Sequence, residues 1–145
     1  MEILIVFSSE SGNTKRVVKL LQTTLEKMNY SVNVKNALTA NEEHFNEANL
    51  VLIGTPVHGY ILFGQKPTSG IRDMLQSGLP IDLMQKPVIG FATYLFFPAG
   101  TLKRIKKSIL SHNGKYMDSF SARRSKKQVL VKEITEYIEK SFPVT

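Results

Sequence analysis

The chain has 145 residues and no cysteine, and its formal net charge is +7. Residues 1–86 hold 8 Lys/Arg and 8 Asp/Glu, whereas residues 87–145 hold 11 and 4, so the second part carries the whole excess. The lack of cysteine excludes thiolate nucleophiles, thiolate-held clusters and disulfides, and no stretch approaches the roughly 20 apolar residues of a membrane-spanning helix. We expect one soluble, cytoplasmic domain over residues 1–145, large enough to bury a core without cross-links.

A short apolar run opens the chain, and a helical pattern follows it. Residues 3–7 are continuously apolar, which is typical of a strand buried on both faces of a sheet. From residue 13 to about residue 28, apolar side chains recur at helical spacing. Residues 31–38 mix polar and apolar side chains, and we expect them to form an edge strand.

The middle of the chain repeats this alternation of strands and helices. Thr39 and Glu42 have the spacing of a capping box, which predicts a short helix. Further strands are predicted at residues 50–53 and 87–93, and further helices at about residues 68–77 and 101–111.

The C-terminal part predicts one more strand and one more helix. Residues 115–122 alternate as a strand does, and Ser125 with Gln128 has the spacing of a second capping box. The apolar residues of the last helix are expected on one face, at Val129, Leu130, Ile134, Tyr137 and Ile138.

Five strands that alternate with about five helices predict an α/β fold of three layers, with a parallel sheet between helices on both faces. The most uniformly apolar strands should be central and the mixed ones should be edges, which gives the order 2-1-3-4-5. In such a sheet, ligands bind at the carboxyl ends of the strands where the winding direction reverses, here between the first and third strands.

The loop at this reversal point is rich in small polar residues. Five of the seven residues 8–14 are Ser, Thr or Asn. The start of a helix offers unpaired N–H groups and a partial positive charge, so a terminal phosphate would fit there. The alternative is that these residues only cap the helix, but capping needs one such residue and not five. Lys15 and Arg16 are expected to be exposed residues of the helix.

Other phosphate-binding motifs are missing from the sequence. There is no GxxxxGK[ST] and, after the first strand, no GxGxxG, which argues against P-loop hydrolysis and Rossmann-type dinucleotide binding. A cysteine-dependent phosphatase is excluded by composition. A phosphorylated receiver domain would need acidic residues at the strand ends, where this chain has serines and Thr55.

The pattern Ser9-x-Ser11-Gly12-x-Thr14, directly after a strand, resembles the phosphate loop with which the flavodoxin family binds FMN. Residues 53–60 resemble that family's second loop, and residues 92–100 occupy the place of its third. The resemblance spans essentially the whole chain. It implies a flavodoxin-like fold of the short-chain branch, because the last predicted strand is uninterrupted.

The resemblance also implies a set of FMN-binding residues. The phosphate would be held by the first loop, at Ser9, Glu10, Ser11, Gly12, Asn13 and Thr14. The flavin ring would lie between Thr55, Pro56, Val57, His58, Gly59 and Tyr60 on one side and Thr93, Tyr94, Leu95 and Phe96 on the other. The family has an aromatic residue where this chain has Val57 and His58, so the stacking residue stays open.

The basic charge departs from the acidic character of flavodoxins. The cations gather in two groups, Lys103, Arg104, Lys106 and Lys107, then Arg123, Arg124, Lys126 and Lys127. The second group follows the last strand, so it is expected at the same edge as the flavin site. There it could dock an acidic redox partner or the phosphates of NAD(P)H. For each residue alone, a solvated surface position is the alternative.

Three functions are compatible with this sequence. The first is a small FMN electron carrier between redox partners, which the single domain favours. The second is an NAD(P)H-dependent quinone or flavin reductase on the same scaffold. The third is an interaction module that has the fold without the flavin. The fold alone does not choose among them.

Overall fold

The computed structural model describes residues 1–7, 12–36, 39–56, 82–94 and 100–144. Its centre is a parallel sheet in the order β2-β1-β3-β4-β5, which confirms the predicted order. The strands are β1 (Glu2–Phe7), β2 (Ser31–Asn36), β3 (Leu50–Pro56), β4 (Pro87–Tyr94) and β5 (Lys115–Arg123). The helices are α1 (Asn13–Lys27), α2 (Glu42–Glu47), α4 (Thr101–Ser111), the 3-10 turn η1 (Arg124–Lys126) and α5 (Lys127–Ser141). The helix predicted at residues 68–77 lies outside the described residues.

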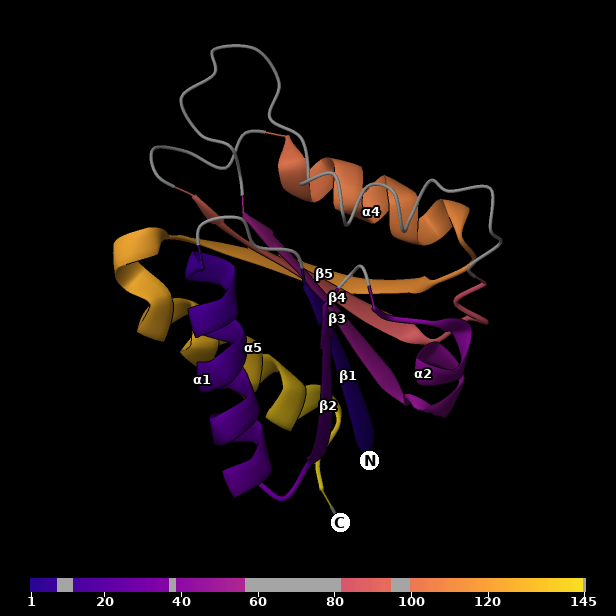
Figure 1. Cartoon of the computed structure of the whole chain (residues 1–145), viewed down its shortest axis with the longest axis horizontal. Helices are drawn as coiled ribbons and strands as arrows, with labels where there is room; N and C mark the ends of the chain where they lie inside the picture. Colours follow the sequence, from indigo (N-terminus) through magenta and orange to yellow (C-terminus); the bar gives the residue numbers. More distant parts are fainter. Residues whose placement is uncertain (8–11, 37–38, 57–81, 95–99, 145) are drawn as a thin grey trace.

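Helices cover both faces of the sheet. α1 and α5 lie on one face, and α2 and α4 lie on the other (Figure 1). β1 and β4 are buried along nearly their whole length, whereas β2 is only half-buried and β5 is half-buried in its middle. The prediction of apolar central strands and mixed edge strands is therefore confirmed.

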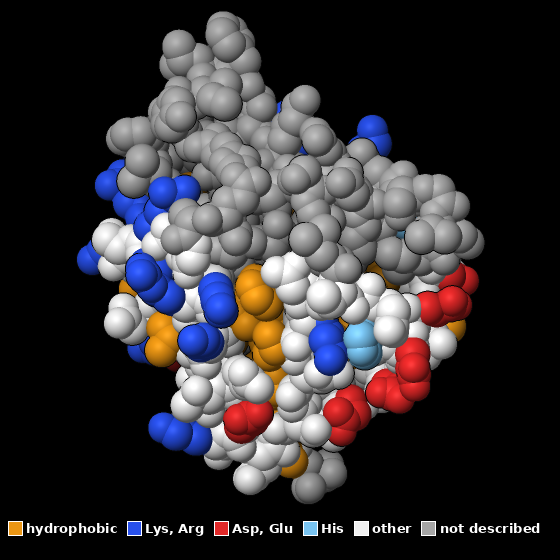
Figure 2. All heavy atoms as spheres, in the orientation of Figure 1, with side chains coloured by type: hydrophobic (Ala, Val, Ile, Leu, Met, Phe, Trp, Pro, Cys, Tyr) orange, Lys and Arg blue, Asp and Glu red, His pale blue; other side chains and the backbone are white. Residues whose placement is uncertain are grey.

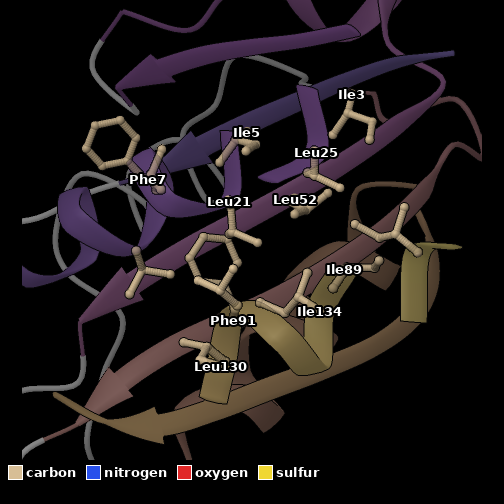
Figure 3. Close-up of a cluster of buried hydrophobic side chains, with 14 of the residues drawn as sticks. Ile3, Ile5, Phe7, Leu21, Leu25, Leu52, Ile89, Phe91, Leu130 and Ile134 are labelled. Carbon is tan, nitrogen blue, oxygen red and sulfur yellow. The ribbon is translucent and has the colours of Figure 1, made fainter. Parts of the chain in front are cut away.

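Each face of the sheet has its own hydrophobic core. Because side chains alternate along a strand, Ile3, Ile5 and Phe7 of β1 face α1 and α5, whereas Leu4 and Val6 face α2 and α4. Figure 3 shows the first core, where side chains of the central strands meet those of the two helices. Burial of these apolar side chains is the main force that holds the layers together.

Gly54 of β3 makes room for an aromatic ring in this first core. A Cβ atom at Gly54 would lie 2.2 Å from the Cζ atom of Phe91, which no side chain could tolerate without displacing the ring. The two residues pair between β3 and β4, and Phe91 is fully buried. The glycine is therefore needed for space close to the carboxyl ends of the strands.

The start of α2 differs from the prediction. The N-cap is Asn41, whose Oδ1 accepts a hydrogen bond from the N–H of His44, and the Nδ1 of His44 accepts one from the N–H of Asn41. The predicted box of Thr39 with Glu42 is wrong because the Thr39 hydroxyl donates to the Asn36 carbonyl instead, at 3.1 Å. The helix accordingly begins after Asn41.

The start of α5 also differs. The predicted box of Ser125 with Gln128 is wrong, because η1 occupies residues 124–126 and the N-cap, Lys126, makes no side-chain capping bond. The buried face of α5 is formed by Leu130, Val131, Ile134, Thr135 and Ile138. Val129 is 47% exposed, so its predicted place in the core is wrong as well.

Among the described residues, no helix is both long enough and apolar enough to cross a membrane.

Candidate functional site

The carboxyl ends of four strands meet at one edge of the sheet. Phe7, the last residue of β1, pairs with Gly54, and Pro56 at the end of β3 pairs with Thr93. Tyr94 at the end of β4 pairs with Arg123. α1 begins at this same edge, so the first, second and third predicted ligand loops all start from one region of the surface (Figure 1).

The first turn of α1 depends on a glycine in an unusual conformation. Gly12 is the N-cap, its φ angle is +82°, and its carbonyl accepts the N–H of Arg16 at 3.1 Å. A Cβ atom at this position would meet nothing within 4 Å, so the backbone angle and not a lack of space selects glycine. A glycine offers no side-chain cap, and the serines of the loop lie outside the described residues, so the alternative that the polar residues only cap the helix stays open.

Thr14 places a buried hydroxyl at the start of α1. Its side chain is fully buried, and its Oγ1 atom has no hydrogen-bond partner within the described part of the chain. Leaving a buried hydroxyl unsatisfied costs about 1–3 kcal/mol. A ligand that accepts a hydrogen bond at this position would remove that cost.

Thr93 places a second such hydroxyl near the end of β4. It is fully buried, and its Oγ1 atom also lacks a partner among the residues that the structure describes. It alternates with Ile89 and Phe91, so it faces the same side of the sheet as α1. By contrast the buried Thr135 on α5 donates its hydroxyl to the Val131 carbonyl at 2.8 Å. Both unsatisfied threonines thus belong to the edge where ligands bind in this class of sheet.

The structure brings together some of the predicted site residues. Gly12, Asn13 and Thr14 begin α1, the strand end Thr55–Pro56 closes β3, and Thr93–Tyr94 closes β4 at the same edge. The others lie outside the described residues, namely Ser9, Glu10, Ser11, Val57, His58, Gly59, Tyr60, Leu95 and Phe96. Which residue stacks on a bound ring therefore stays a prediction.

The sequence analysis missed a hollow beside this edge. Its volume is about 480 Å³, and it lies between α1 and the start of α5, lined by Arg16, Lys19, Leu20, Arg124, Ser125, Lys127 and Gln128. Figure 2 shows Lys and Arg side chains gathered over these elements, at the left of the view. Lys15 and Arg16 are exposed as predicted. The spacing of Arg16 and Lys19, three apart on a helix, was the available signal that they share a face.

Metal binding is not supported by the described residues, which contain no group of three or more His, Cys, Asp or Glu side chains that could hold an ion. Among the described residues, those at the edge offer neutral hydroxyls for hydrogen bonding, and cations lie in the hollow beside it.

Comparison with known proteins finds a partial match to one family and a shared fold. Residues 4–69 match the family described as the flavodoxin domain. The chain has a flavodoxin-like fold. No curated protein sequence matches it significantly.

Solved structures agree with this flavodoxin-like assignment. The flavodoxin of Megasphaera elsdenii, in a two-electron reduced form, is 16% identical with a TM-score of 0.79, and the match covers 96% of this chain and 99% of that one. A flavodoxin from the domain Archaea is 17% identical with a TM-score of 0.71, covering 96% and 99%. The flavodoxin of Fusobacterium nucleatum bound to flavin mononucleotide is 14% identical with a TM-score of 0.72, covering 96% and 95%. At these identities the likeness establishes the fold.

Proposed function

We propose that this flavodoxin-like protein binds FMN at the carboxyl edge of its sheet and carries electrons between redox partners. The observation that carries the proposal is the buried, unpartnered hydroxyl of Thr14 at the start of α1. It lies on a fold shared with a flavodoxin whose structure contains flavin mononucleotide. FMN has the terminal phosphate that such a position favours.

The residues at the edge fit the two polar parts of FMN. Thr14 would donate its hydroxyl to the phosphate, with the loop residues Ser9 and Ser11 and the N–H groups of Gly12 and Asn13 beside it. The strand ends Thr55–Pro56 and Thr93–Tyr94 would frame the ring, and the unpartnered Thr93 hydroxyl could bond its polar rim. Bound FMN supplies the capacity to accept and release one or two electrons. The fit supports FMN over a ligand without a phosphate.

The basic charge indicates in which direction the protein would shift the reduction potential of bound FMN. A cationic protein favours added negative charge nearby, so FMN should be easier to reduce here than in an acidic flavodoxin. A redox partner with an acidic surface would dock near Arg123, Arg124, Lys126 and Lys127. In support, the register pairs Arg123 with Tyr94 at the ligand edge. The carrier would act in the cytoplasm, as the sequence analysis expects.

Titration of the purified protein with FMN tests this function. The expected result is saturable binding of one FMN per chain with quenching of flavin fluorescence, or a yellow protein as purified. A colourless protein that takes up no added FMN would overturn the proposal and favour an interaction module that has the fold without the flavin.

The second candidate is an NAD(P)H-dependent quinone or flavin reductase, and the hollow lined by cations is the feature that favours it. Steady oxidation of NAD(P)H with a quinone and no partner protein would establish that activity. An FMN-loaded protein that accepts electrons from a redox protein but does not turn over NAD(P)H is the result expected of a carrier.

A further inference from the structure

The groove between α1 and α5 begins with a group of four cations, which we call the cationic end. Arg16 and Lys19 come from α1, and Arg124 and Lys127 come from η1 and the start of α5. The other described residues that line the hollow are Leu20, Ser125 and Gln128, and none of the described lining residues is a carboxylate. The group lies at the left of Figure 2, where blue side chains are close together.

These cations form no ion pair with another described residue. Within the described residues, the ion pair found joins Lys132 to Glu136 and involves none of the four. The Nε atom of Arg124 is buried without a hydrogen-bond partner in that part of the chain, and Lys127 donates its Nζ only to the Arg124 carbonyl. Because uncompensated like charges repel one another, an anionic partner would be attracted to this end of the groove.

The groove continues into a less charged hollow, which we call the apolar end. It has a volume of about 310 Å³ and is lined by Leu20, Thr24, Gln128, Val131, Lys132 and Thr135. It shares Leu20 and Gln128 with the cationic end, so the two hollows are adjacent. Leu20 is 39% exposed, so part of its side chain offers apolar surface to a partner.

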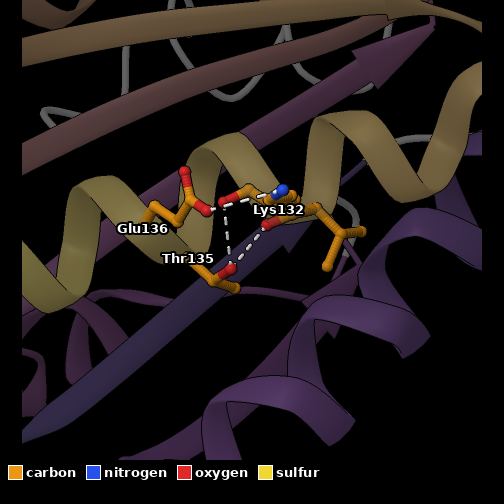
Figure 4. Close-up of polar contacts among 4 residues, drawn as sticks. Lys132, Thr135 and Glu136 are labelled. Carbon is orange, nitrogen blue, oxygen red and sulfur yellow. Dashed lines mark hydrogen bonds and ion pairs between the residues drawn. The ribbon is translucent and has the colours of Figure 1, made fainter.

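Interactions within α5 occupy the polar groups of two residues at the apolar end. The Thr135 hydroxyl donates to the carbonyls of Val131 at 2.8 Å and Lys132 at 3.2 Å, and Lys132 pairs with Glu136 at 4.0 Å (Figure 4). Since the Thr135 hydroxyl is used by its own helix, this end offers mainly apolar surface. The groove is therefore bipartite, with charge at one end and apolar area at the other.

The length of the groove indicates the size of its occupant. From Arg16 to Thr24, α1 advances eight residues, or about 12 Å at 1.5 Å per residue. That length matches about four extended residues or two turns of a helix. A small anion would cover the cationic end and leave the apolar end in water, so a polypeptide segment fits the two ends better.

We propose that this groove docks a segment of a partner protein whose acidic residues meet the cationic end and whose apolar residue covers Leu20. That the partner is a redox protein rests on the proposed electron-carrier function, whereas the binding itself does not need FMN. Arg124 of the cationic end directly follows Arg123, which pairs with Tyr94 at the ligand edge. A docked partner would therefore lie beside the flavin site.

The test uses a short synthetic peptide in which glutamates precede two leucines, titrated into the ¹⁵N-labelled full chain. We expect amide shifts along residues 16–24 and 124–135. The double variant Lys19→Gln/Arg124→Gln should bind the peptide about tenfold more weakly, because two charge pairs are lost. The matched control Lys103→Gln/Lys107→Gln removes the same charge from α4 on the other face of the sheet, and it should change the affinity less than about twofold.

The apolar end has its own test. Leu20→Ser should weaken binding of the leucine peptide, and it should not change binding of a peptide with serines in place of the leucines. Amide shifts confined to α4, or equal losses in both double variants, would overturn the proposal. ATP is the small-anion probe: if it binds more tightly than the peptide and Leu20→Ser changes neither affinity, the groove is a small-anion site and the proposal fails.

FMN affinity measured on the same variants separates this proposal from the proposed function. The variant Lys19→Gln/Arg124→Gln should bind FMN as the natural chain does, because neither residue belongs to the flavin site. If the natural chain binds the peptide but no FMN, the docking groove stands and the electron-carrier function falls.

Discussion

At the amino end of the sheet the polar groups beside the strand starts are paired, whereas at the carboxyl end two buried hydroxyls have no partner in the described chain. The N–H of Glu2 donates to Asn49 at 2.8 Å, and Ser31 donates to the Glu2 carboxylate at 3.0 Å. Thr14 and Thr93 make no such bonds. The amino end is thus held by hydrogen bonds within the protein, whereas the carboxyl end has two buried hydroxyls that could still donate to a ligand.

Substitution of Tyr30, just before β2, should give the largest effect and should act on stability alone. Its ring is buried, and its hydroxyl donates to the Phe142 carbonyl at 2.6 Å. Burial, and then the charge of Glu139, raise the pKa of Tyr30, so the phenol stays protonated as a donor. Tyr30→Ala should lower the free energy of unfolding by about 3–5 kcal/mol in urea denaturation.

The control at this position keeps the ring. Tyr30→Phe loses only the hydrogen bond and should cost about 1 kcal/mol. FMN affinity measured well below the denaturation midpoint should not change in either variant. A loss of FMN affinity in folded Tyr30→Phe would contradict the separation between the two ends of the sheet.

Removal of the Thr14 hydroxyl should weaken FMN binding without lowering stability, the opposite of the effect expected at Tyr30. Thr14→Val keeps the shape of the side chain, so the protein without FMN should be at least as stable as the natural chain. Its dissociation constant for FMN should rise roughly 10- to 100-fold, as expected for a bond to a charged phosphate. Fluorescence titration gives the affinity and urea denaturation gives the stability.

Thr135→Val on α5 is the matched control for this substitution. That residue is buried as well, but its hydroxyl is already bonded to its own helix. We expect it to lose stability and to keep its FMN affinity. If both valine variants lost FMN affinity equally, the role of Thr14 as a ligand-binding residue would be untenable.

The Thr93 hydroxyl should contribute less to FMN binding than that of Thr14. Its expected acceptor is a neutral atom of the flavin ring, so Thr93→Val should cost about 1 kcal/mol of binding, or roughly fivefold in affinity. The stability of the protein without FMN should not fall, because the hydroxyl has no partner to lose among the described residues. A marked loss of stability would show that Thr93 has a structural bond instead.

Acid pH should produce the smallest effect, and at the amino end only. The N–H of Met84, and then the Asn113 amide, lower the pKa of Asp82 below its ordinary value of 3.8. The unfolded chain therefore binds this proton at higher pH, so the contribution is present above the ordinary pKa and is lost as the pH falls through the folded one. Because Asp82 is exposed, its effect on the urea midpoint should be small, and Asp82→Asn should remove it. An unchanged acid profile in that variant would contradict the assignment.

The fold could be predicted because local patterns and burial agree. Continuous apolar runs marked the three central strands, and mixed runs marked the edges, since each pattern reflects how many faces of the strand are covered. The caps were predicted less well. Thr39 and Asn41 are both suitable N-caps, and only the bond from Thr39 to Asn36 decides between them. Ser125 does not cap α5 because it lies within a 3-10 turn, and no local sequence pattern predicted that turn.

The site could be predicted only in part. The start of α1 was found from Gly12 and Thr14, because a hydroxyl-rich turn after a buried strand has a local signature. That the Thr14 hydroxyl is buried and unpartnered depends on tertiary packing, which a sequence does not display. The cationic end of the groove joins α1 to α5, more than a hundred residues apart, so it exists only once the two helices pack together.

The central claim is that Thr14 binds the phosphate of FMN, and comparison of FMN with riboflavin tests it most directly. Riboflavin has the same ring and lacks the phosphate, so both ligands are titrated into the natural chain and into Thr14→Val. We predict that the substitution weakens FMN binding roughly tenfold or more and changes riboflavin binding less than about twofold. An equal loss for both ligands, or no loss for FMN, would contradict the account.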